Sequence, residues 1–177
     1  HNLLEGFRNK KIPLHKAFDV EKMAKLYALS DVMGADHSVI WHNLRFYYNP
    51  VTAKLEPIGF DSNAGGHIVH LIGSNRALYK PSNKFRDIAF SDVLFYEAYL
   101  AQLERMSQPS YIDELLSEVD AEMQAKLNII YKEFPFFYFS KRVFYENQEV
   151  IRKTLNPIKS LHAYFDKQDS SKLVFQM

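Results

Sequence analysis

The chain has 177 residues, a length that suits one domain or one lobe of a larger domain. Hydrophobic residues make up 47% and charged residues 24%, which is a globular composition and excludes a disordered chain. The 22 basic and 21 acidic side chains leave a net charge of +1, so no field of one sign attracts nucleic acid. The absence of cysteine excludes disulfides, thiol nucleophiles and thiolate metal sites.

No apolar run approaches the roughly 18 residues that a transmembrane helix needs. The first residues, HNLLEGFRNKK, lack the apolar core of a signal peptide and read as the middle of a helix. The last residues form an apolar strand pattern at which the sequence stops. We therefore expect residues 1–177 to be a single domain or lobe that belongs to a longer chain.

The first third of the chain predicts a buried helix. Residues 2–9 favour a short helix, and residues 10–18, which contain a proline, favour a loop. Asp19 is a suitable N-cap for a helix that runs from Val20 to about Met33 and ends at Gly34. Because apolar residues cover most of its circumference, we expect this helix at the centre of the domain.

A β-hairpin is predicted over about residues 44–60. Leu44, Phe46 and Tyr48 alternate on one face, and Asn49-Pro50 supplies the turn. Residues 61–85 contain glycine and mixed polarity, which predicts a long irregular loop of the kind that often carries function.

The second half of the chain predicts helices and then strands. Residues 91–157 contain three helical patterns and form a helical subdomain, and the first of these helices shows a helical spacing of Val93, Tyr96, Leu100 and Leu103. Two strands around a polar turn close the chain. The predicted fold class is therefore α+β, mostly helical, with a central β-hairpin and a small C-terminal β element.

Three polar residues lie at the ends of predicted elements, in an order that a phosphoryl-transfer site could use. Asp36 follows the buried helix, Asn43 precedes the hairpin, and Asp61 follows its return strand. Phosphoryl transfer requires an acid that orients the attacking hydroxyl, together with a divalent ion held by hard oxygen ligands. A loop with an acid and an Asn, then a hairpin, then a second Asp satisfies this requirement.

The same stretch resembles the CotH kinase family, the spore-coat-protein kinases with an atypical protein-kinase-like fold. The resemblance covers residues 18–63 and rests on DVEKMAKLYALSDVMGA, DHSVIWHNLRFYYNP and LEPIGFD. It implies the C-terminal lobe of a kinase-like fold, with residues 18–63 as the candidate catalytic-loop and metal-site region. It departs from the family at Phe60, where a Trp is usual, and at Asn63, where a second Asp is usual.

The resemblance also implies a function and residue roles. The chain would belong to an enzyme that transfers phosphate from ATP, with Mg²⁺ or Mn²⁺, to a protein hydroxyl. Asp36 would orient that hydroxyl, and Asn43, Asp61 and Asn63 would be metal ligands. The expected partners are a protein substrate and an upstream nucleotide-binding lobe of the parent chain, and the cell envelope or surface is the location that the family suggests. Because only 17 residues precede Phe18, we expect the chain alone to be inactive.

Several other interpretations stay open. His37 in place of Asp36 could be the base, and His37 with His42 and the nearby acids could bind a metal for hydrolysis. His67 and His70 favour a surface position. The rival to a kinase-like enzyme is a non-catalytic structural or binding module of an envelope or surface protein on the same scaffold. Two segments complete the candidates: DSNAGG (61–66) as a weak phosphate nest and FPFFYF (134–139) as core, as a lobe contact, or as a platform for a sugar or partner.

Overall fold

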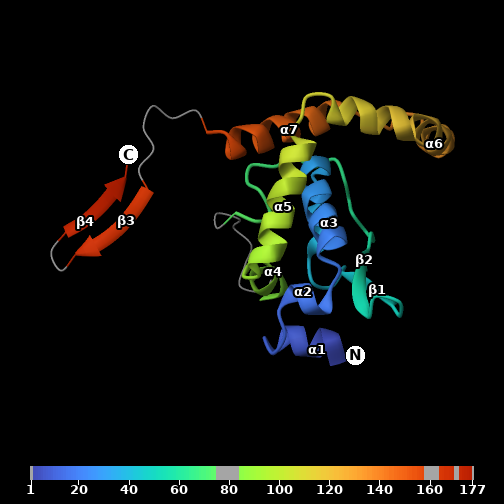
Figure 1. Cartoon of the computed structure of the whole chain (residues 1–177). Coiled ribbons are helices and arrows are strands. Elements are labelled where there is room, and N and C mark those ends of the chain that lie inside the picture. Colours follow the sequence, from blue (N-terminus) through green and yellow to red (C-terminus); the bar gives the residue numbers. More distant parts are fainter. Residues whose placement is uncertain (1, 75–83, 158–163, 170–171, 177) are drawn as a thin grey trace.

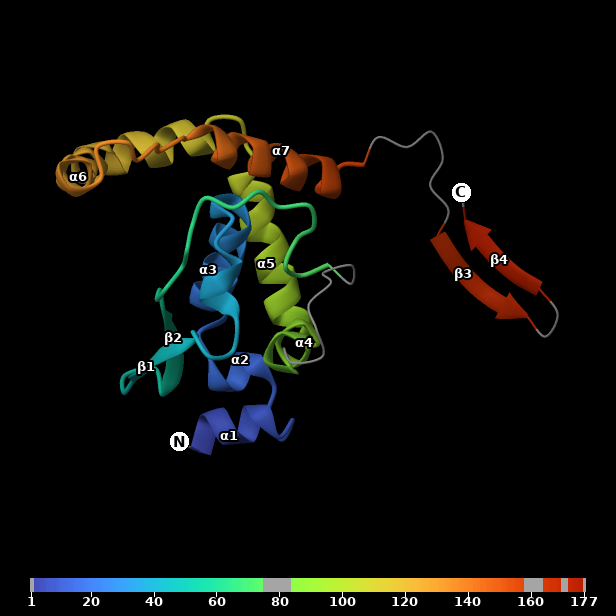
Figure 2. The ribbon, with the colours of Figure 1, turned by 180° about the vertical axis from the view of Figure 1, so that it is seen from behind.

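The structure is a computed structural model that describes residues 2–74, 84–157, 164–169 and 172–176. It is α+β and mostly helical, as the sequence predicts. Helices α3 (Val20–Met33) and α5 (Val93–Met106) lie side by side and form the centre of the molecule (Figures 1 and 2).

The ends of this helix pair are covered by different elements. The short helices α1 (Asn2–Arg8), α2 (Leu14–Ala17) and α4 (Lys84–Phe90) lie at one end (Figure 1). Helices α6 (Tyr111–Glu133) and α7 (Arg142–Leu155) extend across the other end, and α7 packs on α3. None of the helices in the described part of the chain combines the length and apolarity needed to span a bilayer.

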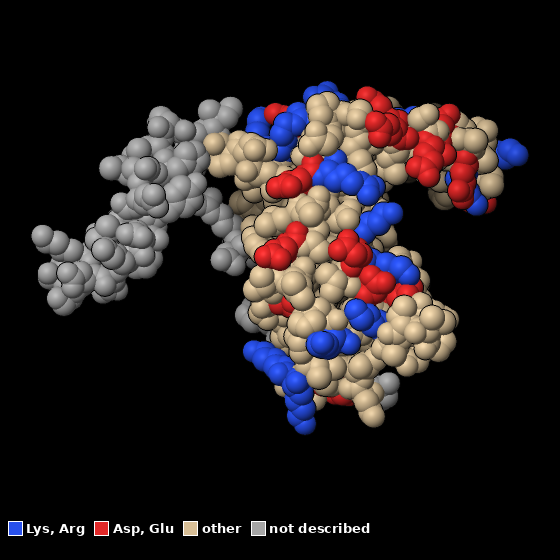
Figure 3. All heavy atoms as spheres, in the orientation of Figure 1, with Lys and Arg blue, Asp and Glu red and all other residues tan. Residues whose placement is uncertain are grey.

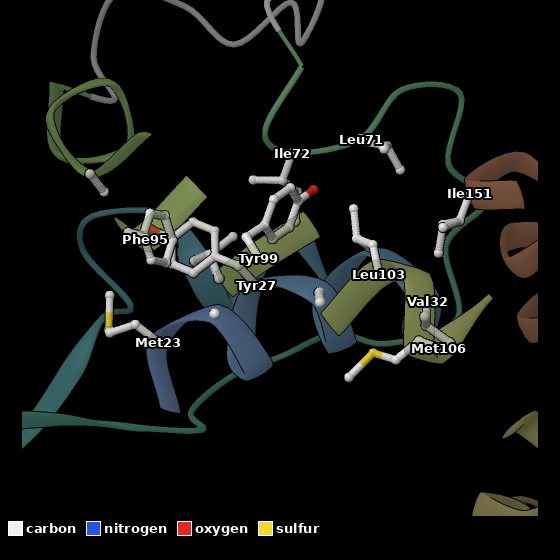
Figure 4. Packing of buried hydrophobic residues seen from close by; sticks show 14 of the residues in the cluster. Met23, Tyr27, Val32, Leu71, Ile72, Phe95, Tyr99, Leu103, Met106 and Ile151 are labelled. Atoms are coloured by element: carbon white, nitrogen blue, oxygen red, sulfur yellow. The ribbon is translucent and has the colours of Figure 1, made fainter. Parts of the chain in front are cut away.

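The bounds of α3 match the prediction because both of its ends carry capping residues. The Asp19 side chain accepts a hydrogen bond from the Lys22 amide at 3.0 Å. Gly34 ends the helix in the left-handed conformation (φ 58°), which glycine adopts without steric cost. Figure 4 shows the packing of this helix against α5, with Tyr27, Phe95 and Tyr99 gathered between them.

Two antiparallel hairpins supply all strands of the described residues. Strands β1 (Arg45–Asn49) and β2 (Lys54–Ile58) form the hairpin predicted for about 44–60, and it lies beside α3. Strands β3 (Tyr164–Asp169) and β4 (Lys172–Gln176) form the predicted C-terminal β element. Its turn at residues 170–171 lies outside the described residues.

Three details of the prediction are wrong. Residues 10–18 are not all loop, because Leu14–Ala17 form α2, and the predicted loop at 61–85 ends inside α4. Helix α5 buries Leu103 of the predicted apolar stripe and packs Leu100 partly against the core, but the rest of its buried face differs from that stripe. That face consists of Phe95, Tyr99, Leu103 and Met106, while Val93 and Tyr96 are exposed.

Candidate functional site

The candidate site begins where α3 ends. After Gly34 the chain forms a short 3₁₀ turn, η1 (Asp36–Val39), whose Ser38 hydroxyl donates to the Ala35 carbonyl at 2.8 Å. The Ser30 and Ser38 hydroxyls also share a hydrogen bond of 2.8 Å. These bonds fix η1 to the last turns of α3, so the residues that follow it have a rigid support.

The structure brings together His37, Asn43 and Asp61, which we call the polar cluster. The buried Asn43 amide donates to the His37 carbonyl at 3.0 Å and to Asp61 Oδ2 at 3.3 Å. Asn43 Nδ2 also lies 2.8 Å from His37 Nδ1. The cluster is reachable from solvent, because the side chains of His37 and Asp61 are 40% and 53% exposed.

His37 is the member of the polar cluster whose proton decides the hydrogen bonding. Its Nδ1 lies 2.8 Å from Asn43 Nδ2 and 3.0 Å from the Asp61 carbonyl oxygen. Without a proton this nitrogen accepts from Asn43, and with a proton it donates to Asp61. His37 Nδ1 can therefore bond to either the Asn43 amide or the Asp61 carbonyl, but not to both at once. Its protonation decides which of these two hydrogen bonds the cluster contains.

Asp61 and Asn63 follow the return strand in an unusual backbone conformation. Both have φ near 46°, in the left-handed region that non-glycine residues rarely adopt. Asp and Asn adopt this region more readily than other non-glycine residues, because their short polar side chains can hydrogen-bond locally. Within the described residues the Asn63 side chain makes no hydrogen bond or ion pair, so its amide is free to bind a ligand.

Asp36 does not contact the polar cluster. It lines a cavity of about 280 Å³ together with Asp31, Gly34, Gly66 and Ile72. The Asp36 carboxylate has no hydrogen-bond or ion-pair partner in the part of the chain that the structure describes. Of the three residues singled out in the sequence, Asn43 and Asp61 contact each other and Asp36 does not contact either. The third member of the cluster is His37, the residue after Asp36.

The floor of this cavity contains a buried acid that the sequence analysis did not single out. Asp31 accepts hydrogen bonds from the Tyr99 hydroxyl at 2.5 Å and from the Ile72 amide at 2.9 Å. Burial raises the pKa of Asp31 to about 7, although these two hydrogen bonds act in the opposite direction. Burial also raises the pKa of Tyr99. The only sequence signal for this role is an acid within the mostly apolar second half of α3, residues 26–33.

The loop after Asp61 is attached to α3 by backbone contacts. The Gly65 amide donates to the Met33 carbonyl at 2.8 Å, and the Gly66 amide donates to the Gly34 carbonyl at 3.2 Å. A Cβ atom on Gly34 would lie only 1.7 Å from the Gly66 carbonyl oxygen. These amides are already used, so residues 61–66 do not present a phosphate nest through Gly65 and Gly66.

Asn147 of α7 holds the same loop from the other side. Its Nδ2 donates to the carbonyls of Val32 (3.1 Å) and Gly66 (2.9 Å), and its Oδ1 accepts from the Ile68 amide (3.0 Å). One fully buried side chain therefore joins α7, the end of α3 and the loop. No local pattern in the sequence signals a contact between residues so far apart.

The remaining candidates lie away from the polar cluster. His67 and His70 are exposed, as predicted, and His67 Nδ1 lies 3.2 Å from Glu146. His42 is exposed and its ring lies 6.0 Å from that of His37. The core interpretation of residues 134–139 is wrong for most of the segment, because Phe134, Phe136 and Tyr138 are 63%, 100% and 83% exposed.

A larger cavity of about 950 Å³ lies between α1, α2 and α4. Its rim carries Lys10 and Lys11, and neither of these residues lies on a strand. Trp41, in the segment between His37 and Asn43, forms part of its wall and stacks on Phe85 at 5.4 Å. None of the residues His37, Asn43 and Asp61 lines this cavity, so the polar cluster lies apart from it.

Comparisons of the chain with protein-family models, with curated proteins and with solved structures found no match.

Proposed function

We propose that this chain is the C-terminal-lobe portion of a CotH-like kinase, which transfers phosphate from ATP to a protein hydroxyl with the help of Mg²⁺ or Mn²⁺. The observation that carries the proposal is the contact between Asn43 and Asp61, which lie 18 residues apart at opposite ends of a hairpin. The unpaired Asp36 carboxylate beside this contact supports it further.

Asp36 is the residue that we assign to the acceptor hydroxyl. A carboxylate orients a hydroxyl and accepts its proton only if no stronger partner occupies it. Asp36 has no such partner among the described residues, and it lines an open cavity. Asp36 is the first residue of η1, and Asn43, which contacts Asp61, follows the end of η1 by four residues.

The polar cluster fits a magnesium ion through a small set of oxygen donors. Magnesium commonly takes one or two carboxylates, with water and substrate phosphates in its other positions. Asp61 provides the carboxylate, and Asn63 has a free amide. Asn43 now directs its Nδ2 at Asp61, so a half-turn of its amide would present the oxygen instead. When bound, the ion would neutralise the charge of the phosphates.

A second candidate function follows from the place of His37. Its Nδ1 lies 3.4 Å from Asp61 Oδ2, so the cluster could hold a transition metal for hydrolysis through His37 and Asp61. Within the described residues no group of three His, Asp or Glu side chains gathers at metal-binding spacing. The kinase-like proposal needs fewer charged ligands, and we favour it for that reason.

The test uses the full-length protein with labelled ATP and either Mg²⁺ or Mn²⁺. Asp61→Asn keeps a residue that tolerates a left-handed backbone, and Asp36→Asn keeps the size of the side chain. We expect either change to lower the rate of phosphate transfer by about a hundredfold or more. Glu122→Gln, on an exposed position of α6, is the matched control and should leave the rate unchanged.

The outcomes separate the candidates. Transfer that depends on Asp36 and Asp61 but survives His37→Asn supports the kinase-like function. Metal-dependent hydrolysis that His37→Asn abolishes supports the hydrolase instead. A folded protein that neither binds nucleotide nor turns over a substrate would leave the non-catalytic structural or binding module as the better interpretation.

A further inference from the structure

The hairpin beside the polar cluster has one strand edge whose hydrogen-bonding groups can be identified. In an antiparallel pair, opposed residues alternate between those that bond to each other and those whose amide and carbonyl point away from the partner strand. Phe46 lies opposite Pro57, which has no amide hydrogen to donate. The pairs at Arg45, Tyr47 and Asn49 are therefore the bonded ones, and Phe46 and Tyr48 direct their backbone groups outward.

An independent bond supports this assignment. Leu55 is opposite Tyr48 in the hairpin, and its carbonyl accepts from the Asp19 amide at 2.9 Å, on the side of β2 away from β1. Leu55 must therefore belong to a non-bonded pair, and so must Tyr48. The outer edge of β2 is partly covered by this contact with residues 18 and 19.

Among the described residues, none forms a comparable hydrogen bond to the outer edge of β1. Figures 1 and 2 both show β1 as the strand farther from α3, and Tyr47 and Tyr48 are 54% and 50% exposed. No side chain of the described residues bonds to the amides or carbonyls of Phe46 and Tyr48. The backbone amides and carbonyls of Phe46 and Tyr48 therefore provide two donors and two acceptors along this edge that no described residue uses.

Natural sheets commonly protect such an edge with Pro, Lys or a bulge. The β1 sequence, RFYYN, contains neither Pro nor Lys, and its register with β2 is continuous. The β3–β4 hairpin, by contrast, has a register shift between Phe165 and Lys167. The unprotected edge belongs to β1, which begins two residues after Asn43 of the polar cluster.

We propose that the edge of β1 binds an extended segment of the protein substrate as a third strand. This inference rests on the proposed function and specifies its substrate, namely an unfolded or extended polypeptide and not the surface of a folded domain. Backbone groups of Phe46 and Tyr48 bind the segment by strand addition, and the exposed Tyr47 and Tyr48 rings contact its alternate side chains. Because β1 starts next to Asn43, residues that follow the added strand reach the polar cluster.

The variant Tyr48→Pro tests the edge without breaking the hairpin. Proline removes the outward amide of Tyr48 but no bond of the β1–β2 ladder. Tyr48→Ala is the matched control, because it removes the ring and keeps the amide. The probe is a hexapeptide that alternates valine and serine, compared with the same peptide carrying N-methyl groups on alternate residues.

We expect the peptide to slow hydrogen exchange at the Phe46 and Tyr48 amides of the 177-residue chain. Tyr48→Pro should weaken binding by about tenfold, which corresponds to the loss of one hydrogen bond of about 1.4 kcal/mol. N-methylation can remove the bonds to both outward carbonyls and should weaken binding at least as much. Tyr48→Ala should weaken it less than Tyr48→Pro. An absence of protection, or equal effects of Pro and Ala, would overturn the proposal, and so would protection that arises without peptide as the chain dimerises.

A transfer assay on the same peptide separates this proposal from the proposed function. If the peptide binds at the edge but full-length protein never phosphorylates it or any other hydroxyl, the phosphotransfer function fails and the strand-addition site stands. If phosphorylation of the peptide is the same in wild type and Tyr48→Pro, the edge proposal fails and the function stands.

Discussion

Helices α3 and α6 differ in length and, more strongly, in the fraction of their residues that is buried. The 14 residues of α3 include seven that are buried, among them Ser30 and Asp31, whereas the 23 residues of α6 include only three. Acidic side chains gather along α6 on the face that Figure 3 shows, and its end leads into the exposed segment 134–139. The candidate site is built on the buried helix. The candidate site is therefore supported by a helix that packs against neighbouring elements over much of its surface.

The largest effect should come from the packing of aromatic rings around α3. Phe95 is fully buried and contacts Tyr27 and Phe90, with ring centroids 5.5 and 4.9 Å apart. Phe95→Ala should lower the unfolding free energy by about 3–5 kcal/mol, because it removes a large buried side chain and leaves a cavity. Phe136→Ala, beyond α6, should change it by less than about 0.5 kcal/mol. Urea denaturation measures both, and similar losses would remove the contrast between the core around α3 and the exposed segment that follows α6.

Gly34→Ala should cost about 3 kcal/mol or more. The new Cβ would overlap the Gly66 carbonyl oxygen, and alanine is strained at a φ of 58°. Gly59→Ala is the control, because its Cβ would meet nothing within 4 Å. We expect Gly34→Ala also to weaken binding of Mn²⁺, which titration calorimetry measures, since the loop that follows Asp61 is displaced. A Gly34→Ala protein as stable as Gly59→Ala would show that the loop is not held against α3.

Asn147→Ala should lower the unfolding free energy by about 2–3 kcal/mol. The change leaves the Ile68 amide and the carbonyls of Val32 and Gly66 without their partner in a buried place. Asn128→Ala, on the exposed surface of α6, should have almost no effect. Thermal unfolding followed by circular dichroism gives both values. If the two substitutions cost the same, the three bonds of Asn147 do not stabilise the fold.

The buried acid of α3 should leave a signature in the pH dependence of stability. The pKa of Asp31 is about 7 in the folded chain and near the ordinary value of 3.8 in the unfolded chain. The folded chain therefore binds more protons than the unfolded chain between pH 4 and 7. Its unfolding free energy contains a contribution that is complete below about pH 4 and is lost as the pH rises through 7.

Asp31→Asn should remove this contribution. Between pH 5 and 7 the wild type should lose about 2 kcal/mol relative to the variant, which denaturation at a series of pH values can measure. Glu122→Gln in α6 should leave the wild-type pH profile unchanged, because Glu122 is exposed. Parallel profiles for wild type and Asp31→Asn would mean that Asp31 is ionised throughout this range.

Local sequence was sufficient to predict the elements that carry their own end signals. Asp19 and Gly34 define α3, and the turn at Asn49-Pro50 defines the hairpin, because capping and turn geometry depend on neighbouring residues. Helix α5 shows the limit of this reasoning. Its residues Val93 and Tyr96 fit a helical period as well as Phe95 and Tyr99 do, and only the neighbouring helix decides which face is buried.

The candidate site was predictable in part for a similar reason. Asn43 and Asp61 stand at the two ends of one hairpin, so a correct hairpin brings them together. The choice between Asp36 and His37 depends on the path of a four-residue 3₁₀ turn, which periodicity does not reveal. The sequence analysis missed Asp31, Tyr99 and Asn147 because they bond to residues 41 to 115 positions away. No local pattern encodes such pairs.

The triple hydrogen bonding of Asn147 has a thermodynamic consequence. A ligand that binds next to Asp61 and shifts the loop must change the free energy of the bonds between that loop and α7. By linkage, anything that binds α7 and changes the same bonds alters the affinity for that ligand by the same factor. Ligand affinity at the polar cluster is then thermodynamically coupled to the conformation of α7, a helix more than 80 residues later in the chain than Asp61.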